Sequence, residues 1–474
     1  MRFGSPEARW VVAATVLGSG MAFLDGTVVN VALPAIGEDL DASVAGLQWT
    51  VNAYLVTLSA LLLIGGSLGD RYGHRTVFVW GAVIFTGASL LCGIAPSTGF
   101  LIAARAVQGA GGALLVPGSL AIIAATFHPD DRGQAIGAWS GLAGVAGSIG
   151  PFLGGWLIDA VSWRLVFLIN IPLAAATIVA ARHVPETRSE TRAPLDVSGA
   201  ALITVALAAI SYAAIDRSDA AVLAAVIGVA TLAGFLVVEH RSSHPMLPLG
   251  LFRSAQFSGT NLTTLAVYAG LGGALFLVVL QLQISLGYSA LQAGSALVPF
   301  AVIMLLLSPI AGRIGQKIGA RIPLTVGPIV ASIGIFLLAT IAPGDGYVAD
   351  VLPGVLVLGV GMAVTVAPLT AAVLGSVGDD QAGVASGVNN AVARFAGLLA
   401  VAVLPGVAGI DTGSSVAESL QSGYERALQV AAVCTAAGGV VAALLVGRTA
   451  RVRTTAHPAV GHACNDAALI DSRA

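Results

Sequence analysis

The sequence is poor in charged side chains. Only 10% of its 474 residues are charged, whereas soluble globular chains carry about 25%. With 57% hydrophobic residues, the chain cannot cover a water-facing surface, and we expect a lipid bilayer to be its solvent. A membrane-spanning helix needs about 20 apolar residues, so a chain of this length can supply well over ten of them.

Cysteines and nucleotide-binding motifs are also scarce or missing. Cys92, Cys434 and Cys464 lie far apart, which predicts neither a disulfide framework nor a metal site. The net charge of −2 argues against a nucleic-acid partner. No phosphate-binding G-x-x-x-x-G-K-[ST] pattern occurs, and no soluble segment is long enough for nucleotide hydrolysis. We therefore expect no cofactor, and an ion gradient as the energy source.

Long apolar runs are what the sequence has in quantity. Because backbone amides in hydrocarbon need internal partners, these runs must be helices, and the fold class is all-α integral membrane. The fourteen predicted spans are 10–34, 47–69, 76–95, 100–127, 134–159, 164–182, 196–215, 220–238, 257–286, 291–311, 322–342, 350–374, 384–408 and 424–447.

The distribution of basic residues predicts the orientation. If the N-terminus is cytoplasmic, seventeen of the 22 Arg and Lys residues lie on the cytoplasmic side and three on the opposite side. Arg105 and Arg394 remain within spans. This bias predicts that both termini are cytoplasmic and that the protein lies in the cytoplasmic membrane.

The chain also repeats itself. "GDRYGHR" (69–75) follows the second span and "GQKIGAR" (315–321) follows the tenth, so spans 1–6 correspond to spans 9–14. Such duplicated halves are typical of secondary transporters, although two ordinary basic turns would give the same local pattern. The predicted parts are a six-helix bundle (1–190), two inserted helices (191–240), a cytoplasmic linker (241–255), a second six-helix bundle (256–448) and a disordered tail (449–474). His457, His462 and Cys464 lie in this tail, where we expect disorder and not a metal site.

Six stretches resemble motifs of the fourteen-helix drug:proton antiporters of the major facilitator superfamily. The stretches are "LDGTVVNVALPAI" (24–36), "LQWTVNAYLVTLSALLLIGGSLGDRYGHR" (47–75), "RAVQGAGGALLVP" (105–117), "GSIGPFLGG" (147–155), "PLDVSGAALI" (194–203) and "LGYSALQAGSALVP" (286–299). The resemblance implies the major facilitator fold, two six-helix pseudo-repeat bundles plus two inserted helices. The second, tenth and thirteenth spans lack the acidic residue that some relatives place there, which leaves the charge of the substrate open.

Asp25 and Arg105 are predicted to face each other inside the membrane. At 1.5 Å per residue, Asp25 lies about 22 Å from the cytoplasmic end of its span, and Arg105 about 8 Å from the outer end of its own. These depths coincide in a hydrocarbon core about 30 Å thick. Because the cation and desolvation act oppositely on the carboxylate, we expect Asp25 to bind the coupled proton and Arg105 to modulate it. A static ion pair is the alternative.

Several polar side chains in the spans are candidates for a substrate cavity between the two halves. Arg394 is the most informative, because no acid in its own span can pair with it. Ordinary hydrogen bonds between helices are the alternative for the amides and the tyrosine. The predicted cavity residues are Asn30, Asn52, Tyr54, Gln281, Gln283, Asn390 and Arg394.

Two further segments are predicted to control the conformational cycle. Charges in two loops could latch the halves together on the cytoplasmic side, although a solvated basic turn is the alternative. The fifth span has a line of glycines for close helix packing and a proline for a bend, and the resemblance implies that it influences the direction of transport. The gating residues are Gly69, Asp70, Arg71, Gly73, Arg75, Asp131 and Arg132. The residues of the fifth span are Gly147, Gly150, Pro151, Gly154 and Gly155, with Gly141 and Gly144 preceding them on the line.

The sequence therefore predicts a secondary active transporter and not an enzyme. We expect it to export small amphipathic drugs, antibiotics or a secreted metabolite in exchange for protons. Its partners would be the small-molecule substrate, protons and membrane lipid, with a monomer sufficient for transport. A proton-coupled nutrient symporter of the same fold and a non-transporting membrane sensor are the alternatives.

Overall fold

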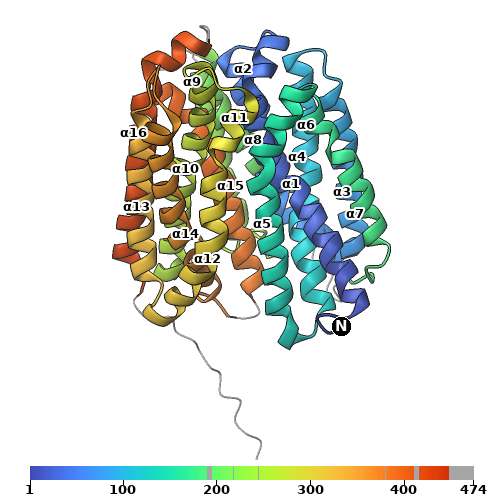
Figure 1. Cartoon of the computed structure of the whole chain (residues 1–474). Coiled ribbons are helices and arrows are strands. Elements are labelled where there is room, and N and C mark those ends of the chain that lie inside the picture. Colours follow the sequence, from blue (N-terminus) through green and yellow to red (C-terminus); the bar gives the residue numbers. More distant parts are fainter. Residues whose placement is uncertain (189–194, 217, 244, 379–380, 410–415, 448–474) are drawn as a thin grey trace, which may run out of the picture.

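The computed structural model describes residues 1–188, 195–216, 218–243, 245–378, 381–409 and 416–447, and it is all-helical within them (Figure 1). Thirteen of the described helices are long and apolar enough to cross a membrane. A shorter apolar stretch, Leu165–Ala181, supplies the remaining predicted span. The predicted disordered tail, with His457, His462 and Cys464, lies outside the described residues.

The helices form two halves and an inserted pair. The N-half consists of α1 (Pro6–Asp39), α2 (Val44–Tyr72), α3 (His74–Gly93), α4 (Thr98–Thr126), α5 (Pro129–Ala160), α6 (Leu165–Leu168) and α7 (Asn170–Ala181). The inserted pair is α8 (Val197–Ile215) and α9 (Asp219–Arg241). The C-half follows the 3-10 turn η1 (Leu249–Arg253) and consists of α10 (Ala255–Ile284), α11 (Ala290–Ala296), α12 (Val298–Ile318), α13 (Arg321–Ala339), the π turn η2 (Tyr347–Val351), α14 (Leu352–Leu374), α15 (Ala382–Val407) and α16 (Val416–Leu445).

Two predicted spans are interrupted near a proline. The sixth span breaks at Ile169, and Pro172 lies in the first turn of α7. The tenth span breaks at Leu297, and Pro299 lies in the first turn of α12. Proline has no N–H and fits the first turn of a helix, so each proline favours a new helix start. The break in the sixth span places Asn170, which is fully buried, at the start of α7.

The packing of the two halves confirms the predicted repeat. In the N-half, α1 packs on α5, α2 and α3 pack on α4, and α1 packs on α7. The equivalent C-half pairs are α10 with α15, α12 and α13 with α14, and α10 with α16. Because each half uses the same set of helix pairs, the duplication extends to the three-dimensional fold. The predicted domain boundaries stay a prediction.

The halves meet along two lateral seams and through contacts of α1 with α10 and α11 between them. On one seam α2 packs on α15, and on the other α5 packs on α11 and α12. The inserted helix α8 contacts both α2 and α15, with Leu207 packed among Val56, Ala60 and Leu398. The inserted pair therefore covers the α2/α15 seam.

The described hydrogen bonds between the halves involve the starts of α2 and α11 and the end of α10. The starts of α2 and α11 lie at the end of the bundle remote from the N-terminus (Figure 1). The Asp159 carboxylate of α5 accepts bonds from the Ser289 hydroxyl (2.6 Å) and the Leu291 amide (3.0 Å) at the start of α11. Gln48 donates to the Val401 carbonyl (2.6 Å), and Gln283 donates to the Val31 carbonyl (3.0 Å). The structure is therefore closed at this end.

Candidate functional site

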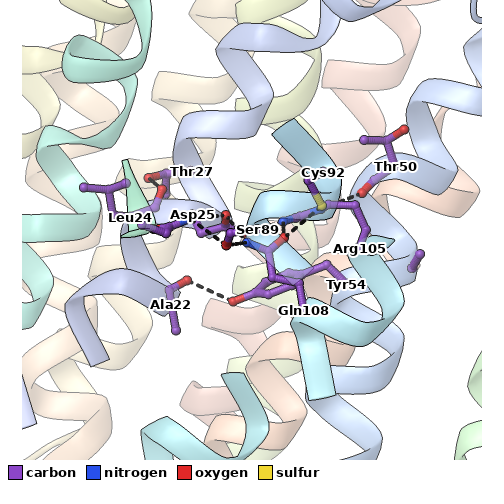
Figure 2. Close-up of polar contacts among 12 residues, drawn as sticks. Ala22, Leu24, Asp25, Thr27, Thr50, Tyr54, Ser89, Cys92, Arg105 and Gln108 are labelled. Carbon is purple, nitrogen blue, oxygen red and sulfur yellow. Dashed lines mark hydrogen bonds and ion pairs between the residues drawn. The ribbon is translucent and has the colours of Figure 1, made fainter. Parts of the chain in front are cut away.

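Asp25 and Arg105 form a buried ion pair between α1 and α4 (Figure 2). The side chain of Asp25 is 0% exposed and that of Arg105 is 1% exposed. The Arg105 Nη1 donates to the Asp25 Oδ2, and the Arg105 Nε donates to the Thr50 carbonyl (3.1 Å). The equal depths expected from the sequence therefore correspond to direct contact. Proton binding at Asp25 stays a prediction.

Two amide side chains that the sequence analysis missed complete the environment of Asp25. Gln108 Nε2 donates to the Asp25 Oδ1 at 2.7 Å, and Asn170 Nδ2 donates to the same oxygen at 3.2 Å. The Gln108 Oε1 accepts a bond from Arg105 (2.6 Å), so Gln108 joins both members of the pair. Ser89 accepts from both amides. Each oxygen of the carboxylate thus has at least one donor, which offsets the loss of water on burial.

Aromatic rings enclose the guanidinium of Arg105. Its Cζ lies 4.3 Å from the ring centroid of Tyr54 and 5.7 Å from that of Phe167. The hydroxyl of Tyr54 donates to the Ala22 carbonyl at 3.0 Å (Figure 2). Tyr54 is fully buried in this conformation and packs on the ion pair, and its predicted place in the cavity between the halves stays a prediction.

Of the two glutamines predicted for the cavity, only one reaches the other half. Gln281 is buried and donates to the Ile341 carbonyl (2.9 Å) within the C-half, and its predicted place in the cavity stays a prediction. Gln283 donates to the Val31 carbonyl of α1 and so bonds across the halves. Gln281 and Gln283 are two residues apart on α10, so their side chains point to different faces of the helix.

Arg394 lies where α15 faces α1. Its Cζ is 5.1 Å from the ring centroid of Phe23, and its Nη1 is 3.9 Å from the position that a Cβ of Gly26 would take. Asn30 follows Gly26 by four residues, so it shares the same face of α1. Asn390 precedes Arg394 by four residues and shares its face of α15. Asn30, Asn390 and Arg394 are all partly exposed, as the predicted cavity requires.

Asn389, beside Asn390 in the sequence, has a different role. Its Nδ2 donates to the Asn261 Oδ1 (3.1 Å) and to the Thr264 hydroxyl (2.7 Å), both on α10. It therefore joins two helices within the C-half.

Asn52 is a buried amide with no hydrogen-bond partner in the described part of the chain. It is 0% exposed, and neither its Nδ2 nor its Oδ1 is bonded. It follows Gln48 by four residues, on the face of α2 that packs against α15. A polar group in this state destabilises the conformation that buries it by about 1–3 kcal/mol.

Asn52 and Asn170 form a matched pair for mutation. We expect Asn170→Leu to lower thermal stability and to slow coupled transport, since it removes a donor from the buried carboxylate at a cost of about 1–3 kcal/mol. We expect Asn52→Leu to leave thermal stability unchanged or raise it. Thermal unfolding of both purified variants measures the difference. Equal destabilisation by the two changes would contradict the hydrogen-bonding pattern described above.

The predicted gating loop is held within the N-half. Glu186, which follows α7, accepts bonds from the backbone amides of Arg75 (3.1 Å) and Thr76 (3.2 Å) and contacts the Arg75 side chain at 3.6 Å. Asp70 contacts His74 one turn later at 3.5 Å. Gly73 has a φ of +107°, which favours glycine, and Gly69 packs against the ring of His74.

The other predicted gating residues also have partners in the N-half. Asp131 accepts from the Phe3 amide at 3.0 Å, and Arg132 donates to the Phe127 carbonyl at 3.2 Å. Arg71 lies over the Tyr72 ring at 5.6 Å. In this conformation, with the halves joined at the opposite end, these charges do not bond across the halves within the described residues. A latch in the opposite conformation stays a prediction.

The glycines of α5 serve two different contacts. A Cβ on Gly147, Gly150 or Gly154 would meet α1 within 3.3 Å, so these three permit close packing inside the N-half. A Cβ on Gly155 would lie 2.4 Å from the Ala290 carbonyl oxygen, across the halves. The same two helices approach closely at Gly294 of α11, where a Cβ would lie 2.0 Å from the Pro151 carbonyl oxygen of α5.

Gly141 and Gly144 do not continue the packing face, contrary to the expectation of one line. No described heavy atom lies within 4 Å of a Cβ placed on either residue. They lie in the N-terminal half of α5, whereas Gly155, which contacts α11, lies near its C-terminal end.

The fold agrees with the comparison with known proteins. A profile described as Major Facilitator Superfamily matches residues 15–402. The chain belongs to the major facilitator superfamily. This superfamily protein is 35% identical over 438 residues to the probable actinorhodin transporter of Streptomyces coelicolor, covering 88% of this chain and 76% of the relative. It is also 35% identical to the cephamycin export protein CmcT of Amycolatopsis lactamdurans, covering 91% of this chain and 92% of the relative.

A solved structure supports the fold. A POT family transporter in complex with a thioalcohol-conjugated peptide superposes with a TM-score of 0.70 at 14% identity, covering 93% of this chain and 96% of that one. This likeness shows the major facilitator fold alone. Membership of the superfamily makes the chain a multi-pass membrane transporter and not an enzyme.

Proposed function

We propose that this protein exports small amphipathic molecules, such as drugs, antibiotics or a secreted metabolite, in exchange for protons. Relatives that are named as transport and export proteins for antibiotics support export over the nutrient symport considered from the sequence. The observation that carries the proton coupling is the buried pair of Asp25 and Arg105, closed in by Gln108 and Asn170.

The proposed cycle uses the carboxylate of Asp25 as the proton-binding group. While Asp25 is ionised, it attracts Arg105 and accepts bonds from two amides. Protonation removes the charge that holds this cluster together, so the packing of α1 against α4 and α7 changes. Because α1 also contacts α10 and the Arg394 of α15, such a change can reach the interface between the halves.

The proposed orientation places both termini in the cytoplasm, as the basic residues predict. With that orientation, the end at which Asp159 binds α11 is the outer end, and the structure is closed to the outside. A substrate would enter from the cytoplasm in this conformation. Outward release then requires that the Asp159 and Gln48 contacts break.

Flux measurements in inverted membrane vesicles test this function. With an imposed pH gradient, we expect substrates from a panel of lipophilic dyes and antibiotics to dissipate the gradient in vesicles that contain the protein. Vesicles from cells without the protein serve as the control. If no compound changes the gradient in a protein-dependent way, proton-coupled export is wrong.

A further inference from the structure

Arg394 is an intramembrane cation whose charge no described acid balances. It lies in the middle of α15 (Ala382–Val407), and no ion pair with a carboxylate is formed by this residue within the described part of the chain. Asp25, the acid on the facing helix α1, is turned toward α4 and is already paired with Arg105. An unpaired cation in the membrane interior is costly, so such a residue marks a functional site.

The described contacts of Arg394 offset its charge only in part. The ring of Phe23 lies 5.1 Å from the guanidinium, and its π face attracts a cation weakly. A guanidinium has five N–H donors, and none of them has a described hydrogen-bond acceptor. The residue is partly exposed, and its guanidinium lies beside Phe23 and Gly26 of α1 in the other half.

The surroundings of Arg394 fit a ligand with one acidic group on an apolar or aromatic body. Phe23 supplies an aromatic surface, and the bare backbone of Gly26 leaves space beside the guanidinium. Asn30 and Asn390, on the same faces of α1 and α15, can donate hydrogen bonds to oxygen. Guanidinium groups bind carboxylate oxygens through two parallel bonds, which gives both strength and orientation.

We propose that Arg394 binds the deprotonated acidic group of the exported molecule, so that the preferred substrates are amphipathic organic anions. This inference rests on the proposed export function and specifies its substrate class. The sequence had left the charge of the substrate open, and the unpaired cation facing α1 decides it. Export of one such anion with import of one proton is equivalent to the inward movement of two positive charges in each cycle. Exchange of a neutral substrate for one proton moves only one.

Matched acid and amide probes test this inference. We would measure binding of naphthalene, anthraquinone and pyrene carboxylates, each with its uncharged carboxamide, to the purified full-length protein by intrinsic tryptophan fluorescence. We expect wild type to bind the acid about ten- to a hundredfold more tightly than the amide for at least one ring system, as a hydrogen bond to a charged group allows. Arg394→Gln should remove that preference and leave amide binding unchanged, and Arg394→Lys should retain part of it.

Arg426→Gln is the matched control, because it removes an exposed positive charge from the C-half away from α1. Equal binding of acid and amide to wild type for all three ring systems would overturn the inference. A parallel loss of acid and amide binding in Arg394→Gln would also overturn it. Binding does not depend on flux, so an acid preference without proton-driven transport would contradict the proposed exchange and leave the anion site standing.

Discussion

Replacing Asp25 by asparagine is expected to abolish proton-coupled transport. Asparagine keeps the shape of the side chain and still accepts hydrogen bonds, but it does not ionise at any physiological pH. Substrate-dependent dissipation of a pH gradient in inverted vesicles should therefore fall to the level of vesicles without the protein. The same change leaves Arg105 buried without its counter-charge, at a cost of about 3–5 kcal/mol in stability.

A double variant separates the loss of the proton from the loss of the ion pair. Asp25→Asn combined with Arg105→Gln removes both charges, so we expect thermal stability to recover while coupled flux stays absent. If the double variant transports as wild type does, Asp25 serves only the structure. Asp39→Asn is the matched control on the same helix, because Asp39 lies at the far end of α1 with an exposed contact to Arg164 at 2.6 Å.

Replacing Gly155 by leucine is expected to prevent closure at the end remote from the N-terminus. Its Cβ position lies 2.4 Å from the Ala290 carbonyl oxygen and 2.5 Å from the Leu291 Cα, so a side chain must displace α11. Overpacking of this kind costs about 1–3 kcal/mol. Each 1.4 kcal/mol shifts a two-state equilibrium about tenfold. We therefore expect the closed conformation to be depleted about five- to 140-fold, and transport to fall with it.

The matched control is Gly144→Leu, on the same helix, where no described atom meets the new Cβ. Closure can be measured by the labelling rate of Ala293→Cys, a fully buried position on α11, in a background without the native cysteines. We expect an impermeant thiol reagent to label this site faster in Gly155→Leu and at the parental rate in Gly144→Leu. Unchanged labelling and flux in Gly155→Leu would show that the close approach of α5 and α11 is not needed.

The sequence was sufficient for the features that depend on length, charge and repetition. The fourteen apolar runs follow from the thickness of a bilayer, and the duplicated halves follow from the paired loop motifs. The contact of Asp25 with Arg105 could be expected because a fixed rise per residue converts position into depth, and two buried charges at one depth stabilise each other.

The features that depend on which face of a helix points toward which neighbour could not be predicted in this way. Gln108 and Asn170 are neutral amides within apolar runs, so nothing in composition distinguishes them from amides that join helices elsewhere. Gln281 and Gln283 could not be told apart for the same reason, because two positions only two residues apart on one helix bond to different partners. Pro172 was the available signal for Asn170. A proline predicts a break in the helix, and a buried amide beside such a break can reach partners on other helices.

The inserted pair α8 and α9 shields one seam between the halves from lipid and leaves the other seam without such a shield. Because α8 contacts both α2 and α15, it separates that seam from the bilayer, and α9 covers α8 with a largely exposed apolar surface. The described α5/α12 seam has no comparable cover. Within the described residues, we therefore expect a hydrophobic molecule dissolved in the membrane to approach the space between the halves along α5 and α12. A bulky side chain placed on that side is then expected to select among substrates before they reach the proposed site at Arg394.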